Sequence, residues 1–216
     1  MLPTNKTLVQ CDFDGTITTE DIGFQMLDTF ARGKWLELLA QYQAGQISVG
    51  RFNTKAFAMV RETKKTLDRF ALKTATARAG FKQLLECCRQ KGFRFVIVSN
   101  GMTFYIKTIL KGMGLDDIEI FAANARFDPG GIITNYVGPD GTELADGFKE
   151  AYSQHFLKNG YRIVYMGNGA SDALPARLAD HIFATGQLLT HCQEANFKCT
   201  PFSDLNDVAR GIKLLP

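Results

Sequence analysis

The spacing of hydrophobic residues changes along the chain and predicts where helices and strands lie. Residues 7–11 are strand formers that lead directly into a run of acids and glycine. From residue 20 to about 73, apolar positions beginning at Phe24 recur at steps of three and four, which predicts helices. Glycines divide this block into about four helices, and Ser48 is placed to cap the third.

After about residue 78, predicted strands and helices alternate. Such alternation predicts a parallel sheet with right-handed crossovers, in which ligands bind beyond the carboxyl ends of the strands. The predicted strands are 93–98, 118–122, 161–166 and, as the final one, 181–185, with a β-hairpin at 127–137. The predicted helices are 81–90, 104–111, 149–157 and one that begins at 173–178.

Composition excludes several classes of protein. The 216 residues are 45% hydrophobic and 22% charged, with a net charge of +3, as in an ordinary globular protein. Basic residues are scattered, and acids flank the doublet Lys64-Lys65, so no nucleic-acid partner is expected. No apolar stretch is long enough to span a membrane, and residues 1–10 lack a signal-peptide run, which predicts a soluble cytoplasmic protein. The five cysteines and three histidines show no zinc-ligand spacing.

Asp12 and Asp14 stand one residue apart at the end of the first predicted strand. In extended chain, alternate residues point the same way, so both carboxylates can face one pocket while Phe13 turns into the core. Gly15 allows a sharp turn after them. Such a pair suits a carboxylate nucleophile beside a general acid/base, although an isolated pair is more often a capped strand end.

Four segments in order resemble the motifs of the haloacid dehalogenase-like hydrolases. Residues 12–18 resemble the first motif, DxDGT, and Ser99 matches the second. Lys149 matches the third motif, and residues 167–172 lie where the family has its fourth, GDxxxD. The resemblance covers essentially the whole chain.

The resemblance implies a phosphatase mechanism. Asp12 would attack phosphorus and form an aspartyl-phosphate, and Asp14 would protonate the leaving oxygen and then activate water. The hydroxyl of Ser99 and the groups that follow it would bind the phosphoryl oxygens. The implied phosphate-binding residues are Ser99, Asn100, Gly101 and Lys149.

The resemblance also implies a Mg²⁺ cofactor, with one departure from the family pattern. Mg²⁺ would be held by Asp12, the backbone carbonyl of Asp14, Asn168 and waters. Asp172 would support this site or move inward to ligate the metal directly. The family usually has an acid at the position of Asn168, and an amide oxygen is a suitable but uncharged ligand. We therefore expect weaker Mg²⁺ binding.

The family branch that includes phosphoserine phosphatase carries a helical cap between its first two motifs. The expected fold is α/β, a Rossmann-like parallel sheet flanked by helices, with a core of residues 1–18 and 79–216. An inserted helical-bundle cap domain of residues 19–78 would close over the site. The protein is expected to be a monomer or a homodimer.

Within this branch the chain is similar to the phosphatases of methionine salvage, which act on 2-hydroxy-3-keto-5-methylthiopentenyl-1-phosphate. The similar segments are residues 10–18 with Asp21, residues 99–102 with the aromatic pair that follows, and residues 184–202. Asp21 would contact the substrate from the cap side. Phosphoserine, or phosphocholine and phosphoethanolamine, are alternative substrates among small phosphorylated metabolites. A weakly or non-catalytic phosphometabolite-binding protein is the alternative of another class.

Overall fold

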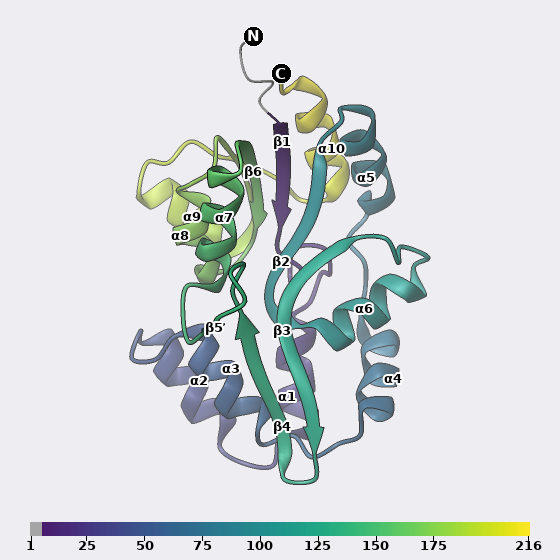
Figure 1. Cartoon of the computed structure of the whole chain (residues 1–216), viewed down its shortest axis with the longest axis vertical. Helices are drawn as coiled ribbons and strands as arrows, with labels where there is room; N and C mark the ends of the chain where they lie inside the picture. The colour runs from purple at the N-terminus through teal and green to yellow at the C-terminus, as the bar shows by residue number, and fades with distance from the viewer. Residues whose placement is uncertain (1–5) are drawn as a thin grey trace.

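Residues 6–216, which the computed structural model describes, contain one eight-stranded sheet (Figure 1). Its strand order is β5-β4-β3-β2-β1-β6-β7-β8. The strands are β1 (Lys6–Cys11), β2 (Arg94–Met102), β3 (Glu119–Asp128), β4 (Gly131–Val137), β5 (Glu143–Leu144), β6 (Tyr161–Gly167), β7 (His181–Ala184) and β8 (Thr200–Pro201). The buried stretches of β1, β2 and β6 are nearly continuous, as expected for strands covered on both faces.

The centre of the sheet is parallel. β1 pairs in parallel with β2 and β6, while β3–β4 and β4–β5 are antiparallel. In register, Cys11 lies opposite Ile97 on one side and Met166 on the other. The residues that follow Cys11, Ile97 and Met166 therefore meet at one edge of the sheet.

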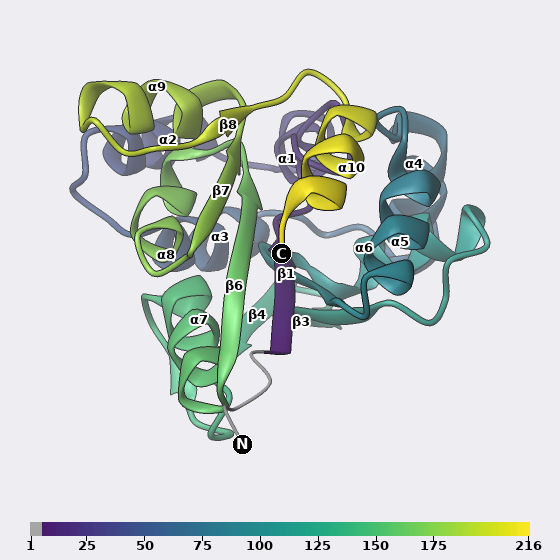
Figure 2. The same ribbon diagram turned by 90° about the horizontal axis from the view of Figure 1, so that it is seen from above.

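Helices cover both faces of the sheet (Figure 2). Helices α5, α6 and α10 lie on one face, and α7, α8 and α9 lie on the other. Their bounds are α5 (Phe81–Gln90), α6 (Thr103–Gly112), α7 (Phe148–Lys158), α8 (Ala173–Ala176), α9 (Gly186–Glu194) and α10 (Leu205–Leu214). This arrangement confirms the predicted α/β fold. Between residues 6 and 216, no helix has the length and apolar character needed to cross a bilayer.

Four helices gather beyond the carboxyl end of β1, where its arrow points in Figure 1. They are α1 (Ile22–Phe30), α2 (Trp35–Gln43), α3 (Val49–Phe57) and α4 (Lys64–Thr74). Polar side chains begin three of them: Asp21, Ser48 and Thr63 each accept a hydrogen bond from a backbone N–H of the first turn. Each such cap stabilises a helix by about 1 kcal/mol, and Ser48 caps the third helix as predicted.

The two linkers of this helical segment lie side by side. Thr18 pairs with Ala77 in an antiparallel bridge, and the Thr19 N–H donates to the Thr76 carbonyl at 2.9 Å. The Arg78 side chain donates to the backbone carbonyls of Gly15 and Thr16. The segment therefore leaves and rejoins the rest of the chain at one point. That residues 19–78 act as a separate cap domain stays a prediction.

The last part of the chain differs from expectation. Residues 181–185 were expected to form the final strand, but α9, β8 and α10 follow β7. β8 is only two residues long and includes Pro201, so it offers no alternating pattern from which a strand can be predicted. Residues 118–122 and the first arm of the predicted hairpin form one continuous strand, β3.

Candidate active site

The loop after β1 carries both predicted catalytic acids into one cavity. The Asp12 N–H donates to the Met166 carbonyl at 2.9 Å, which extends the β1–β6 pairing by one residue. Phe13 is fully buried, whereas Asp12 and Asp14 line the cavity, as the alternation predicted. Gly15 turns the chain with φ +71°, a conformation that favours glycine.

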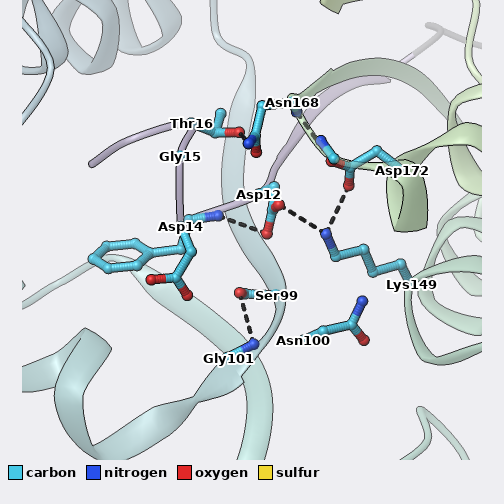
Figure 3. Close-up of polar contacts among 12 residues, drawn as sticks. Asp12, Asp14, Gly15, Thr16, Ser99, Asn100, Gly101, Lys149, Asn168 and Asp172 are labelled. Atoms are coloured by element: carbon cyan, nitrogen blue, oxygen red, sulfur yellow. Dashed lines mark hydrogen bonds and ion pairs between the residues drawn. The ribbon is translucent and has the colours of Figure 1, made fainter. Parts of the chain in front are cut away.

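Lys149, the second residue of α7, lies between two carboxylates. Its Nζ is 2.9 Å from Asp12 Oδ2 and 2.6 Å from Asp172 Oδ1, and its side chain is only 1% exposed (Figure 3). Burial lowers the pKa of Lys149, but the two carboxylates outweigh burial and hold that pKa above its ordinary value. Burial raises the pKa of Asp12 to about 7, although Lys149 opposes this rise. Lys149 is therefore a fixed cation beside Asp12.

Asp172 is fully buried, and each of its oxygens accepts two hydrogen bonds. Oδ1 accepts from Lys149 and, at 2.7 Å, from the Tyr165 hydroxyl, while Oδ2 accepts from the N–H groups of Asn168 and Gly169 at 3.0 and 2.9 Å. Direct metal ligation by Asp172 would break some of these bonds. The geometry therefore favours the supporting role, although both roles remain predictions.

Asn168 contacts the loop after β1. The Thr16 hydroxyl donates to Asn168 Oδ1 at 2.8 Å (Figure 3). A side chain at Gly15 would collide with the Asn168 amide, so glycine is needed there for a second reason. The two loops thus place the oxygens of Asp12 and Asn168 at the same strand edge.

The oxygen atoms gathered at this strand edge suit a hard cation that needs few carboxylate ligands from the protein. In the part of the chain that the structure describes, no three His, Cys, Asp or Glu side chains form a metal-binding group. The Asp12 carboxylate, the Asp14 carbonyl and the Asn168 amide offer oxygen only. Mg²⁺ commonly binds through one or two carboxylates and keeps several waters, so these residues fit it.

Ser99 and the two residues after it line the opposite wall of the cavity. Ser99 is buried, and its Oγ accepts from the Gly101 N–H at 3.0 Å, so its own proton can be donated to a ligand. The Asn100 carbonyl accepts from Asn53 of α3 at 2.8 Å and from the Tyr136 hydroxyl at 2.5 Å. Sequence reasoning missed Asn53 and Tyr136, since no local pattern marks either residue.

Asp14 is held by donors on both of its carboxyl oxygens. The Ile22 N–H donates to Oδ1 at 2.9 Å, and the Tyr105 hydroxyl donates to Oδ2 at 2.6 Å. Burial, followed by the negative charge of Asp21, raises the pKa of Asp14 well above its ordinary value. Tyr105 was visible in the sequence only as one member of the aromatic pair after residue 102.

The cavity has a volume of about 600 Å³ and a largely apolar side. Asp21 lines it and also caps α1, because its Oδ1 accepts from the Phe24 N–H at 2.8 Å. The apolar side is formed by residues from α1, α2 and α3: Phe24, Leu39, Tyr42, Val49 and Phe57. All nine sequence-predicted site residues except Asp172 line this cavity, and Asp172 lies directly behind Lys149.

Residues 9–176 match the family model described as haloacid dehalogenase-like hydrolase. The chain belongs to this family. It is 31% identical over 219 residues to a 2-hydroxy-3-keto-5-methylthiopentenyl-1-phosphate phosphatase of Bacillus velezensis. The match covers 97% of this chain and 91% of the relative. A protein of the same name from an Exiguobacterium species is 28% identical over 214 residues, covering 96% and 98%.

Solved structures of family members have the same fold. A phosphoserine phosphatase in the form of a phospho-aspartyl intermediate analogue superposes with a TM-score of 0.72 at 17% identity, covering 96% of this chain and 99% of that one. A phosphoserine phosphatase from T. onnurineus gives 0.69 at 22% identity, covering 100% and 99%. Together with the family match, these comparisons identify the chain as an enzyme of the phosphatase class.

Proposed function

We propose that this chain is a magnesium-dependent phosphomonoesterase that forms an aspartyl-phosphate on Asp12. The observation that carries the proposal is the placement of Asp12 at the floor of the cavity, with Lys149 fixed 2.9 Å from its Oδ2. A buried carboxylate beside a permanent cation can approach an anionic phosphoryl group without the full cost of charge repulsion.

The side chains support a two-step reaction. In the first step, an Asp12 oxygen attacks phosphorus, the bond from phosphorus to the leaving oxygen breaks, and Asp14 gives that oxygen a proton. In the second step, Asp14 takes a proton from water as the water oxygen attacks phosphorus and the bond to Asp12 breaks, which releases phosphate. Lys149 and the Ser99 hydroxyl stabilise the charge on the phosphoryl oxygens throughout.

Magnesium would be held by Asp12, the Asp14 carbonyl and Asn168. When bound, it supplies positive charge that offsets repulsion between the phosphoryl group and the Asp12 carboxylate. Because Asn168 contributes no charge, we propose that this site binds Mg²⁺ more weakly than one with aspartate there.

The proposed substrate is 2-hydroxy-3-keto-5-methylthiopentenyl-1-phosphate, after the names of the relatives. The apolar side of the cavity suits an uncharged, sulfur-containing chain end. Phosphoserine carries a carboxylate that needs a cation. Among the described residues that line the cavity, Lys149 is the only Lys or Arg, and two carboxylates already pair with it. This favours a substrate with an uncharged leaving group over phosphoserine.

Phosphocholine or phosphoethanolamine is the second candidate substrate. The aromatic rings of Phe24, Tyr42 and Phe57 line the cavity together with the Asp21 carboxylate. Aromatic faces and a carboxylate are the groups that bind quaternary or primary ammonium ions. This combination favours a cationic chain end over an anionic one.

A phosphate-release assay over a panel of phosphomonoesters tests the proposal. The panel contains the methylthiopentenyl phosphate, phosphocholine, phosphoethanolamine, phosphoserine and p-nitrophenyl phosphate, each with Mg²⁺. We expect the highest kcat/KM for the methylthiopentenyl phosphate and the lowest for phosphoserine. A higher value for phosphocholine would replace the first candidate with the second.

Asp12→Asn is the control for every substrate, because the amide cannot form an acyl phosphate. Absence of turnover by the wild type with all five compounds would contradict the proposal. If the wild type shows no turnover but still binds phosphate, the result would instead support a non-catalytic phosphometabolite-binding protein.

A further inference from the structure

Tyr105 of α6 contacts the proposed acid/base residue directly. Its side chain is fully buried, and its hydroxyl is 2.6 Å from Asp14 Oδ2. Glycine at position 101 leaves room for this hydrogen bond, because a side chain there would collide with both the Tyr105 hydroxyl and Asp14 Oδ2. At Gly23 an added Cβ would lie 3.4 Å from the same hydroxyl. The hydroxyl therefore lies close against the backbone of Gly101.

We propose that Tyr105 is a positioning residue for general acid catalysis by Asp14. The inference rests on the proposed function. Asp14 Oδ1 is fixed by the Ile22 N–H and Oδ2 by Tyr105, so the plane of the carboxyl group is set by two donors from different elements. Tyr105 and Asp14 both line the cavity.

Tyr105 acts on the proton-transfer part of the first step. As the bond from phosphorus to the leaving oxygen breaks, the proton of Asp14 passes to that oxygen, and Asp14 becomes a carboxylate. A neutral tyrosine hydroxyl that donates to this carboxylate stabilises it, and hydrogen bonds to charged groups are roughly twice as strong as neutral ones. Tyr105 therefore stabilises the charge that appears on Asp14 and keeps the carboxyl group oriented.

This role has a signature that a structural role lacks. An alkoxide is a poor leaving group and needs the proton from Asp14, whereas p-nitrophenolate leaves without one. Loss of the Tyr105 hydroxyl should therefore slow cleavage of alkyl phosphates more than cleavage of p-nitrophenyl phosphate. The parameter to compare is kcat/KM, because it reports only the steps through release of the leaving group.

The test compares wild type, Tyr105→Phe and Tyr152→Phe on a primary alkyl phosphate and on p-nitrophenyl phosphate. Tyr152 is a matched control: it is also buried, but its hydroxyl donates to the Val137 carbonyl at 3.1 Å, away from the cavity. For Tyr105→Phe we expect kcat/KM to fall roughly tenfold or more with the alkyl phosphate, a part of the 10²–10⁴ that general acids contribute. With p-nitrophenyl phosphate it should stay within about threefold. Tyr152→Phe should not change the ratio of kcat/KM for the alkyl phosphate to kcat/KM for p-nitrophenyl phosphate.

Asp14→Asn provides the second measurement. It should show the same bias against the alkyl phosphate, and adding Tyr105→Phe to it should deepen the bias by less than about threefold, because no acid remains to be positioned. Equal losses with both substrates for Tyr105→Phe, or no loss with either, would overturn the inference. A Tyr105→Phe protein too unstable to assay would mark Tyr105 as structural and overturn it as well. Absence of turnover by the wild type would instead overturn the proposed function, which separates the two failures.

Discussion

At the scale of single residues, the site is organised by charges that the fold has removed from water. Lys149 and Asp172 are almost wholly buried, and their mutual contact of 2.6 Å replaces the lost hydration. A buried pair of this kind is costly to assemble and more costly to break, since one partner is left as an uncompensated charge. Stability and chemistry therefore depend on the same few side chains.

Asp12→Asn should abolish turnover while the protein stays folded. The amide oxygen can still accept the hydrogen bond that the Phe13 N–H now donates to Asp12 Oδ1 at 2.7 Å, but the amide cannot attack phosphorus. Circular dichroism and p-nitrophenyl phosphate hydrolysis check the two parts. Activity within about tenfold of wild type, a loss of only ~1.4 kcal/mol, would contradict the nucleophile assignment.

Asn168→Asp should lower the Mg²⁺ concentration needed for half-maximal activity. Aspartate keeps an oxygen for the Thr16 hydroxyl and adds a negative charge to the proposed ligand set. Magnesium titrations of both proteins with one substrate provide the measurement. Coinciding half-saturation values would show that ligand charge at this position does not control Mg²⁺ affinity.

Asp172→Ala should destabilise the protein by about 3 kcal/mol, because Lys149 keeps Asp12 as its one remaining carboxylate and the buried Tyr165 hydroxyl loses its acceptor. It also removes the acceptor of the Asn168 and Gly169 N–H groups, so the loop after β6 loses its anchor. Urea unfolding measures the loss, with Glu37→Ala, which breaks an exposed pair with Lys34, as the comparison. Equal stability of the two variants would show that Asp172 is not a structural support.

At the scale of elements, the hairpin of β3 and β4 lies close to the helical segment. Gly131 has φ +140°, and a side chain there would collide with the Ala58 carbonyl at the end of α3. A Cβ added at Gly130, its neighbour in the same turn, would lie 3.4 Å from Asp128 Oδ1, which is an ordinary van der Waals contact. A side chain can therefore be accommodated at Gly130 but not at Gly131.

Gly131→Ala should destabilise the protein by about 1–3 kcal/mol, because backbone must shift to admit the methyl group. Gly130→Ala should change the stability by no more than about 0.5 kcal/mol, as ordinary surface substitutions do. Thermal unfolding of both variants compares them directly. A similar loss for both would mean that the turn, and not its contact with α3, limits stability.

The sequence predicted the elements that have strong local patterns. Helix α5 has the bounds 81–90 expected from its apolar spacing, and the parallel core follows from the alternation of strands and helices. The acids after β1 and Ser99, which was predicted to follow a strand 93–98 but lies within the longer β2, could be placed at one edge because strand ends coincide in a parallel sheet. The short edge strand β8 and the extension of β3 were missed, since both are fixed by pairing with neighbouring strands and not by local pattern.

The contacts that complete the site could not be predicted in this way. Tyr105 reaches Asp14 across 91 positions of sequence, and Tyr136 reaches Asn100 across 36. A buried tyrosine has the same apolar signature whether its hydroxyl serves a carboxylate or a carbonyl. Only the packing of α6 and β4 against the strand ends distinguishes the two.

At the scale of the whole molecule, the cavity is enclosed from two sides. Its floor comes from the strand ends and its apolar side from α1, α2 and α3. Asn53 of α3 also donates to the Asn100 carbonyl beside Ser99. A ligand in the cavity therefore contacts both the sheet and the helical segment.

Binding of Mg²⁺ with inorganic phosphate should slow amide hydrogen exchange in α1 to α3. Exchange in these helices depends on local opening, and a ligand that contacts both the strand ends and these helices disfavours that opening. Mass-spectrometric exchange with and without the ligands measures the effect, and α10, which contributes no residue to the lining of the cavity, is the internal reference. Slower exchange spread evenly over all helices would contradict a segment that moves as a unit.

The adjacent linkers bear on how such a protein can diversify. Because Thr18 and Ala77 pair directly, the residues between them form an excursion that starts and finishes at one place. The pairing of β1 with β2 and β6 does not depend on the length of that excursion. Insertions are tolerated best where entry and exit lie close together. Exchange of this one stretch of sequence could thus give the same phosphoryl chemistry to a new metabolite, without any change in the order of strands.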